Sequence, residues 1–259
     1  MESPFLKVDN LSISFGGIRA LDDIGFAMKK GEIFSVIGPN GAGKTTLFNC
    51  ISGLYRPDQG SIRFKGSHID GKKPHAIARL GIARTFQNIE LFSNMNTMEN
   101  LMLGRHLHMK TGLFRGMFMW GEQSFAAREE VRHREKVEGI IDLLELQNVR
   151  DRFVGALPYG TQKLIELGRA LALEPELLLL DEPCAGMNSE EKQDMIFWIK
   201  DIQDELGISI LLIEHDMTMV MDISDRILAI NFGRPVTLGT PGEVQQNREV
   251  LKAYLGEEA

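Results

Sequence analysis

The chain has few cysteines. Only two are present, Cys50 and Cys184, and their separation fits no metal-ligand spacing. We therefore expect two free thiols in a reducing compartment.

Long apolar runs are also missing. A bilayer-spanning helix needs about 20 consecutive apolar residues, whereas the strongest runs here, residues 177–180 and 208–213, have only strand length. The first residues lack the basic and then apolar order of a signal peptide. These absences predict a cytoplasmic chain that contacts a membrane only through partners.

Positive charge is in deficit, with 29 Lys and Arg against 36 Asp and Glu and a net charge of −7. Nucleic-acid-binding domains normally present a basic face, so no nucleic-acid partner is expected. The 259 residues, with 43% hydrophobic and 25% charged, suffice for one large globular domain that carries an insertion.

Strand and helix patterns alternate in much of the chain. Residues 6–15 and 24–28 alternate like β-strands around a Gly16-Gly17 turn, and residues 32–37 form a strand that enters a glycine-rich turn. Later predicted strands are Leu177–Asp181, 208–214, Arg226–Asn231 and 235–238, and the predicted helices are 162–173 and Ser189–Leu206. This order predicts an α/β fold with a mainly parallel sheet and an N-terminal antiparallel β part.

The middle of the chain has a different character. Between residues 89 and 155 no strand pattern occurs, and residues 126–146 carry apolar side chains at helical spacing. We predict an inserted α-helical subdomain at residues 89–160, between two parts of the α/β core at 1–88 and 161–259.

A phosphate-binding loop lies between the predicted strand at 32–37 and the next helix. Gly38, Gly43, Lys44 and Thr45 match the P-loop pattern, whose glycines let successive N–H groups face one anion. In this pattern the lysine reaches the β- and γ-phosphates and the hydroxyl of Thr45 binds Mg²⁺. The predicted nucleotide-binding residues here are Gly38, Pro39, Asn40, Gly41, Ala42, Gly43, Lys44, Thr45 and Thr46. The sequence therefore predicts a P-loop NTPase core that binds ATP and Mg²⁺.

Two carboxylates, Asp181 and Glu182, follow the apolar run at 177–180. A buried parallel strand delivers its last residues to the sheet edge where ligands bind. Asp181 is therefore the predicted Mg²⁺ residue, and Glu182 is placed to polarise the water that attacks the γ-phosphate.

Together these residues resemble the ATP-binding subunits of ABC transporters, and the resemblance extends along nearly the whole chain. It implies that Phe15 stacks on adenine, that Gln87 contacts Mg²⁺ and the attacking water, and that His215 contacts the γ-phosphate. Each also has an ordinary alternative: a core aromatic for Phe15, a solvated amide for Gln87 and a satisfied histidine for His215. Glu182, His215 and Lys44 are the predicted catalytic residues.

Two further segments resemble family motifs. Residues 185–188 resemble the D-loop, although Asn188 is equally suited to cap a helix with Glu191 in a capping box. The signature segment departs from the family pattern, because Pro158 replaces its serine and Thr161 its glutamine. We expect Tyr159, Gly160 and Thr161, at the start of a helix near Thr161, to hold phosphate through backbone N–H groups.

The signature tyrosine, residues 182–188 and the ending at 250–256 resemble the branched-chain amino acid importer branch. The resemblance implies a second cassette, identical or different, and transmembrane permease subunits, with the chain peripheral on the inner face of the cell membrane. Two alternatives stay open: a catalytically weak cassette of such a complex, and a soluble ATPase of DNA repair.

One segment fits no motif. Residues 113–120 are dense in methionine and aromatic side chains, which predicts either a docking surface for the membrane subunit or core packing of the helical subdomain.

Overall fold

The computed structural model describes residues 3–109 and 125–255, which form two compact units. The α/β unit contains the chain up to Gln87, residues Glu176–Ala185 and the chain from Lys192 onward. The helical unit contains Asn88–Pro175 and Gly186–Glu191. Residues 161–175 thus belong to the helical unit, whereas the predicted boundary was at residue 160. The segment at 113–120 lies outside the described residues, so the choice between docking and packing there stays a prediction.

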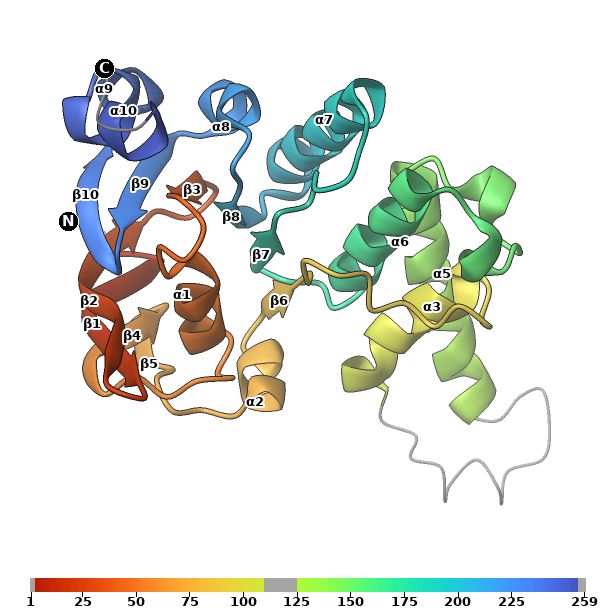
Figure 1. Cartoon of the computed structure of the whole chain (residues 1–259). Helices are drawn as coiled ribbons and strands as arrows, with labels where there is room; N and C mark the ends of the chain where they lie inside the picture. The colour runs from red at the N-terminus through yellow and green to blue at the C-terminus, as the bar shows by residue number, and fades with distance from the viewer. Residues whose placement is uncertain (1–2, 110–124, 256–259) are drawn as a thin grey trace. The chain divides into compact units, whose positions relative to one another are not determined.

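The α/β unit holds two sheets (Figure 1). The first is antiparallel and has the strand order β2-β1-β4-β5, formed by Ile18–Met28, Leu6–Phe15, Gln59–Phe64 and Ser67–His68. The second has the order β10-β9-β3-β8-β7-β6, formed by Arg234–Gly239, Arg226–Asn231, Ile33–Ile37, Ser209–Ile213, Leu177–Asp181 and Ile82–Arg84. Its strands are parallel except β10, which pairs antiparallel with β9. The predicted fold class is confirmed.

The strand order brings distant segments to one edge. Strand β8 lies between β3 and β7 and runs parallel to both. The segments after β3, β7 and β8 therefore meet at the carboxyl edge of the sheet. They are the predicted phosphate loop, the Asp181-Glu182 pair and the segment of His215.

Helices cover both faces of the parallel sheet. Leu47, Phe48 and Ile51 of α1 (Lys44–Ile51) are fully or nearly fully buried in a core with residues of both sheets. The other face of β9 packs, through Ile227 and Ala229, on a cluster that includes residues of α8, α9 and α10. These three helices are Met217–Ile223, Pro241–Gln245 and Arg248–Leu255. The α/β unit also contains α2 (Pro74–Arg79) and most of α7 (Ser189–Leu206).

The helical unit packs α3 (Thr97–Gly104), α5 (Phe125–Leu143) and α6 (Tyr159–Leu171) on one another. A short 3₁₀ helix, η1 (Arg105–His108), comes after α3. Two more, η2 (Gln147–Val149) and η3 (Val154–Ala156), lie between α5 and α6. Gly168 of α6 lets the helices approach, because a Cβ there would lie 3.0 Å from Cδ1 of Leu144. None of the described helices of either unit is long and apolar enough to cross a membrane.

Cys50 is a free thiol, as predicted, and both cysteines are buried, with Sγ of Cys184 3.4 Å from Sδ of Met219. Burial raises the pKa of the Cys50 thiol to about 12. This thiol therefore stays protonated and unreactive at neutral pH.

A buried polar cluster links α5 to the end of α3. Arg105 and His133 are 3% and 5% exposed, and Nε of Arg105 donates to Nδ1 of His133 at 3.2 Å. Nη1 of the same arginine donates to the carbonyl of Ala172 at 2.7 Å. Burial, and next the positive charge of Arg105, lower the pKa of His133 below its ordinary value of 6.5.

This cluster predicts a pH-dependent stability. The folded chain keeps His133 neutral at a pH where the unfolded chain already protonates it, so stability is complete above about pH 6.5 and falls on acidification. We expect the urea midpoint of unfolding to drop between pH 7 and pH 5.5. His133→Gln, which keeps a neutral acceptor, should show a shallower drop. An equal drop of the urea midpoint with pH in the wild type and in His133→Gln would contradict the assignment to His133.

Candidate functional site

The loop at residues 38–43 curves tightly at the end of β3. A Cβ on Gly38 would lie 2.2 Å from the carbonyl oxygen of Ile230. Gly43 has φ 102° and caps α1, and a Cβ there would lie 2.5 Å from the carbonyl of Ala20. Only glycine fits at these two positions, and the loop presents the first N–H groups of α1, which have no partner inside the helix.

Lys44, the first residue of α1, is 6% exposed. Its Nζ donates to the carbonyls of Gly38 at 2.6 Å and Pro39 at 3.1 Å, so the ammonium lies over the loop. Burial lowers the pKa of Lys44, and the charges of Glu182 and Asp181 oppose that shift. The two acids therefore help to keep the lysine cationic.

A polar cavity of about 250 Å³ opens at this loop. Ala20, Gln87 and Glu182 line it together with the loop, so residues from four parts of the chain meet at one place. The lining residues are Ala20, Asn40, Gly41, Ala42, Gly43, Lys44, Thr45, Thr46, Gln87 and Glu182. The cavity therefore has the donors expected for a polyphosphate and a carboxylate beside them.

Glu182 has a strained backbone, with φ 49° in the left-handed region. Its N–H donates to the carbonyl of Ile213 at 2.9 Å, and Nε2 of Gln87 donates to its Oε2 at 2.9 Å. Strain at a non-glycine residue persists only where the surroundings impose it and is frequent at active sites. The contact with Glu182 also argues against a merely solvated amide at Gln87.

Asp181 lies below the surface with a partner that the sequence did not reveal. Nη2 of Arg84 lies 2.7 Å from Oδ2 of Asp181, and the two side chains are 8% and 2% exposed. Nη1 of Arg84 also donates to Asn49 and Ser52, on and just beyond α1. Arg84 thus joins the helix of the phosphate loop to the acidic end of β7.

His215 lies at the end of β8 with a half-exposed side chain. Its Nδ1 is 3.7 Å from Oε2 of Glu182 and 3.7 Å from Oε2 of Glu214. The structure therefore places the three predicted residues Gln87, Glu182 and His215 beside one another.

Phe15 ends β1 and is 44% exposed, so it is not a core aromatic. Its ring packs edge-on against Tyr55, with the centroids 5.1 Å apart. Tyr55 was not among the predicted site residues, because no motif marks it and only the tertiary structure brings the two rings together.

In the helical unit, α6 starts at Tyr159, two residues before the predicted start at Thr161. Pro158 is the N-cap and offers no side-chain cap. Proline fits this end because its fixed φ suits a helix entry. Gly160 and Thr161 therefore lie in the first turn, where the backbone N–H groups have no intrahelical partner.

The D-loop segment packs on that turn within the same unit. A Cβ on Gly160 would lie 2.5 Å from Oε1 of Glu191, and a Cβ on Gly186 would lie 3.1 Å from the ring of Tyr159. Asn188 caps α7 by accepting from the N–H groups of Glu190 and Glu191, and Glu191 accepts from the N–H of Asn188. The predicted capping box is confirmed.

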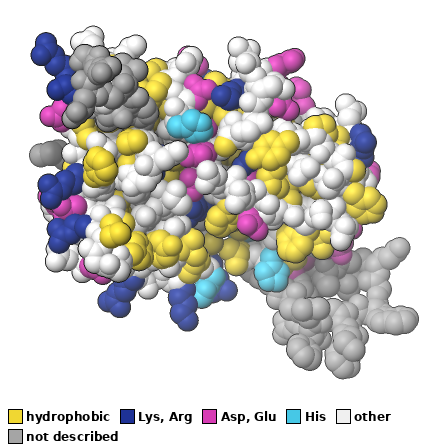
Figure 2. Space-filling model, viewed as in Figure 1, with side chains coloured by type: hydrophobic (Ala, Val, Ile, Leu, Met, Phe, Trp, Pro, Cys, Tyr) yellow, Lys and Arg dark blue, Asp and Glu magenta, His cyan; other side chains and the backbone are white. Residues whose placement is uncertain are grey.

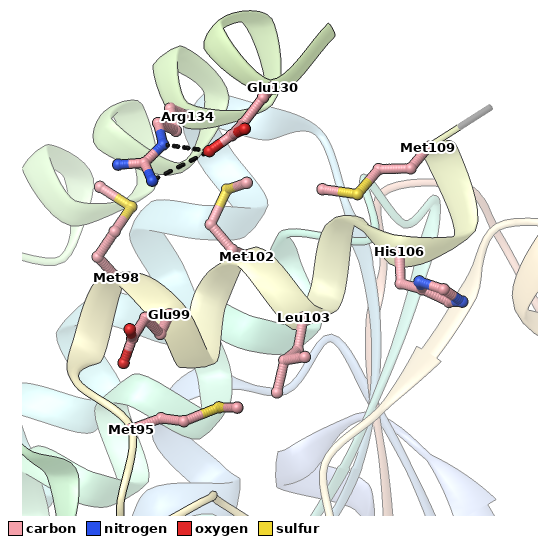
Figure 3. A pocket seen from close by; sticks show the side chains of 9 residues that line it. All are labelled: Met95, Met98, Glu99, Met102, Leu103, His106, Met109, Glu130 and Arg134. Carbon is pink, nitrogen blue, oxygen red and sulfur yellow. Dashed lines mark hydrogen bonds and ion pairs between the residues drawn. The ribbon is translucent and has the colours of Figure 1, made fainter. Parts of the chain in front are cut away.

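A second pocket, of about 320 Å³, lies in the helical unit between α3 and α5 (Figure 3). Methionine side chains dominate it, and an ion pair between Glu130 and Arg134 closes one side. The lining residues are Met95, Met98, Glu99, Met102, Leu103, His106, Met109, Glu130 and Arg134. Below, this set is called the methionine pocket.

Metal-binding clusters of three or more His, Cys, Asp or Glu do not occur among the described residues. This finding is compatible with Mg²⁺ at a nucleotide site, because Mg²⁺ there takes only one or two protein ligands beside phosphate oxygens and water. Thr45 and Gln87 line the cavity and supply oxygen donors of that kind, whereas Asp181, the third predicted Mg²⁺ residue, is not among the lining residues and its carboxylate is paired with Arg84.

Comparison with known proteins agrees with this geometry. Residues 21–185 match the ABC transporter family model, and residues 236–259 match that of the branched-chain amino acid ATP-binding cassette transporters. The chain is 42% identical to the high-affinity branched-chain amino acid transport ATP-binding protein BraF of Pseudomonas aeruginosa and to LivG of Escherichia coli K12. Both matches cover 99% of this chain and 100% of the relative.

Solved structures give the same answer. A nucleotide-free ATP-binding cassette from an ABC transporter superposes with a TM-score of 0.85 at 30% identity, covering 98% of this chain and 100% of that one. An ATP-binding cassette in its ADP conformation also reaches 0.85 at 30% identity, covering 99% and 100%. These full-length matches favour a transporter subunit over a DNA-repair ATPase. The chain belongs to the ABC transporter family, as one of its ATP-binding and ATP-hydrolysing subunits.

Proposed function

We propose that this cassette hydrolyses ATP in the cavity at residues 40–46 with Glu182 as the general base. The observation that carries the proposal is the shared cavity of Lys44, Gln87 and Glu182 at the carboxyl edge of the sheet. The loop N–H groups and Lys44 bind and orient the phosphates. The cavity thus supplies the positioning and charge stabilisation on which phosphoryl transfer depends.

Within this cavity each side chain has a distinct task. Glu182 accepts the proton of the attacking water at Oε2, the oxygen to which Gln87 donates. Gln87 orients that carboxylate, and His215, whose Nδ1 lies 3.7 Å from Oε2 of Glu182, contacts the γ-phosphate in this proposal. Thr45 and Gln87 would hold Mg²⁺ directly and Asp181 through water, and the ion would supply positive charge beside the phosphates when bound. Phe15, exposed at the end of β1, stacks on the adenine.

A second cassette, identical or different, completes the site. The first turn of α6, with Tyr159, Gly160 and Thr161, contributes its N–H groups to the nucleotide of the facing cassette. ATP then holds the two cassettes together, and hydrolysis removes the bridging charge, which shifts the pair toward the open state.

The signature substitution gives a direct test of this role. In the Pro158→Ser variant the added hydroxyl can donate to a phosphate oxygen, a charge-assisted bond of about 1.5–3 kcal/mol. Because only the part of this bond that is stronger in the transition state than in bound ATP speeds hydrolysis, we expect the rate at saturating ATP to rise several-fold, up to about tenfold. Pro158→Ala is the control, because it removes the ring without adding a hydroxyl. A serine variant no faster than the alanine variant would refute the proposed contact.

We propose branched-chain amino acids as the cargo, from the names of the relatives that match over the whole length. The cassette then acts at the inner face of the cell membrane, bound to permease subunits. On the face drawn in Figure 2, Lys and Arg side chains are scattered and form no single continuous basic patch, so this face offers no large positive surface to anionic lipids.

Reconstitution tests the whole proposal. The cassette would be purified with its membrane subunits from detergent-solubilised membranes and incorporated into vesicles. ATP-dependent uptake of labelled leucine, isoleucine or valine is expected, and Lys44→Ala should abolish it. Uptake of another solute would change the cargo assignment only, whereas hydrolysis that is absent in the intact complex would favour a catalytically weak cassette.

We propose the methionine pocket as the surface that receives the permease subunit. Methionine side chains adapt to the shape of an inserted segment, and the polar groups at the rim are satisfied internally: Glu130 pairs with Arg134, and Glu99 caps α3. A short apolar helix of the membrane subunit matches a pocket of this chemistry.

Substitution within the pocket tests this docking. Met102, half-buried on α3, changed to Glu places a charge in the pocket, and we expect at least tenfold less membrane subunit to co-purify while the melting temperature changes little. Val131→Glu is the matched control, because Val131 is 54% exposed on α5 and does not line the pocket. A folded Met102→Glu protein with normal assembly would exclude this surface.

A further inference from the structure

We propose that Glu214, a residue to which no motif assigns a task, is a positioning residue that holds Glu182 and His215 in their working geometry. This inference rests on the proposed hydrolysis of ATP at Glu182.

Glu214 is a buried carboxylate at the end of β8, with 0% exposure. Its Oε1 accepts from the N–H of Cys184 at 3.0 Å. Its Oε2 accepts from the N–H of His215 at 2.9 Å and, more weakly, from that of Asp216 at 3.3 Å. Hydrogen bonds that a carboxylate accepts are about twice as strong as those between neutral groups, and in a buried site they are not exchanged for bonds to water.

These bonds join two loops that follow neighbouring strands. Cys184 lies two residues after Glu182, beyond the end of β7, and His215 follows β8, with Asp181 of β7 paired to Ile213 of β8. The backbone ladder stops at this edge, since the last bond across it runs from Glu182 N–H to the Ile213 carbonyl. Beyond this bond, the carboxylate of Glu214 connects the two segments by accepting from the N–H groups of Cys184 and His215.

The strain at Glu182 gives this bridge its importance. A glutamate at φ 49° returns to an ordinary conformation unless its neighbours prevent it. On the carboxyl side of that residue, the N–H of Ala185 bonds within the turn to the Glu182 carbonyl, and the N–H of Cys184 bonds across to the neighbouring loop, with Glu214 as its acceptor. The same carboxylate orients the backbone of His215, whose Nδ1 lies 3.7 Å from Glu182. One side chain thus sets the position of the general base relative to the histidine.

The test is Glu214→Gln, which keeps the shape of the side chain. Its NH₂ cannot accept a hydrogen bond, so one of the two loops loses its acceptor. Small displacements at a reacting centre lower rates about 100-fold. We expect kcat for ATP hydrolysis by the full chain to fall roughly 10- to 100-fold, with KM for ATP changed less than about threefold because the phosphate loop is untouched.

Glu32→Gln is the matched control. Glu32 is also a buried glutamate of the α/β unit, 5% exposed, and its Oε2 accepts from the N–H of Lys29 at 2.6 Å. It precedes β3 and therefore lies at the edge of the sheet opposite to the phosphate loop. We expect it to lower the melting temperature with kcat unchanged. Should Glu214→Gln fail to fold, Glu214→Asp keeps the charge but is too short to reach both loops, and an intermediate loss of kcat is expected.

Two readouts separate positioning from general stability. In the His215→Ala background Glu214→Gln should cost clearly less than in the wild type, because its effect acts partly through that histidine. Amide hydrogen exchange at residues 184, 215 and 216 should accelerate together in Glu214→Gln and not in Glu32→Gln, whether or not ATP is hydrolysed. If the kcat losses of Glu214→Gln and His215→Ala simply multiply in the double variant, the role of Glu214 is overturned. Unchanged hydrogen exchange at these three amides would overturn it as well. Wild-type protein without hydrolysis would count against the proposed function, while the exchange experiment would still decide on the bridge.

Discussion

Glu182→Gln is expected to lower the rate of ATP hydrolysis by about 10²- to 10⁴-fold, the usual contribution of a general base. The amide introduced there fills the same space but cannot take a proton from water. ATP affinity should change little, since the N–H groups of the loop and Lys44 bind the phosphates. Steady-state hydrolysis and equilibrium ATP binding, measured on the same preparation, check both parts.

Glu205→Gln is the control for this experiment, because Glu205 is an exposed glutamate on α7. A loss of ATP binding in Glu182→Gln would show that the glutamate supports the nucleotide rather than the water. Retained hydrolysis would remove it from the mechanism and favour another proton acceptor.

Arg84→Met is expected to destabilise the α/β unit by about 3–5 kcal/mol, the range found when one partner of a buried ion pair is removed. The methionine occupies much of the volume but removes the guanidinium that lies 2.7 Å from the carboxylate of Asp181, which is 2% exposed. Two further bonds, to Asn49 and Ser52, disappear as well. Urea unfolding, followed by a probe in the α/β unit, measures the change.

Two variants frame this prediction. Arg79→Met removes an exposed arginine at the end of α2 and should change stability by less than about 0.5 kcal/mol. Arg84→Lys keeps the charge but cannot form the planar fork that joins three partners, so an intermediate loss is expected. A loss below about 1 kcal/mol in Arg84→Met would mean that the pair contributes little.

The phosphate loop and the acidic strand end could be located without coordinates, because their spacing reflects local backbone rules. Gly43 needs φ 102° to turn β3 into α1, and apolar residues 177–180 mark a strand buried on both faces. Strand β6, with three residues, is too short for a periodic signal and forms through pairing with β7. The short helices α8–α10 escaped prediction for a similar reason, since packing on β9 and β10 rather than a long periodic pattern stabilises them.

The candidate phosphate-binding side chains, the candidate proton acceptor and the α/β order that brings them to one sheet edge were all predictable from the amino-acid sequence. These predictions rest on contacts within a few residues or on strand direction. The supporting contacts came from packing in the folded chain: Arg84 pairs with Asp181, Glu214 bridges two loops and Tyr55 packs against Phe15. Such partners lie 30 to 97 residues apart. Nothing in local spacing encodes them, because the folded chain alone sets the distance between their atoms.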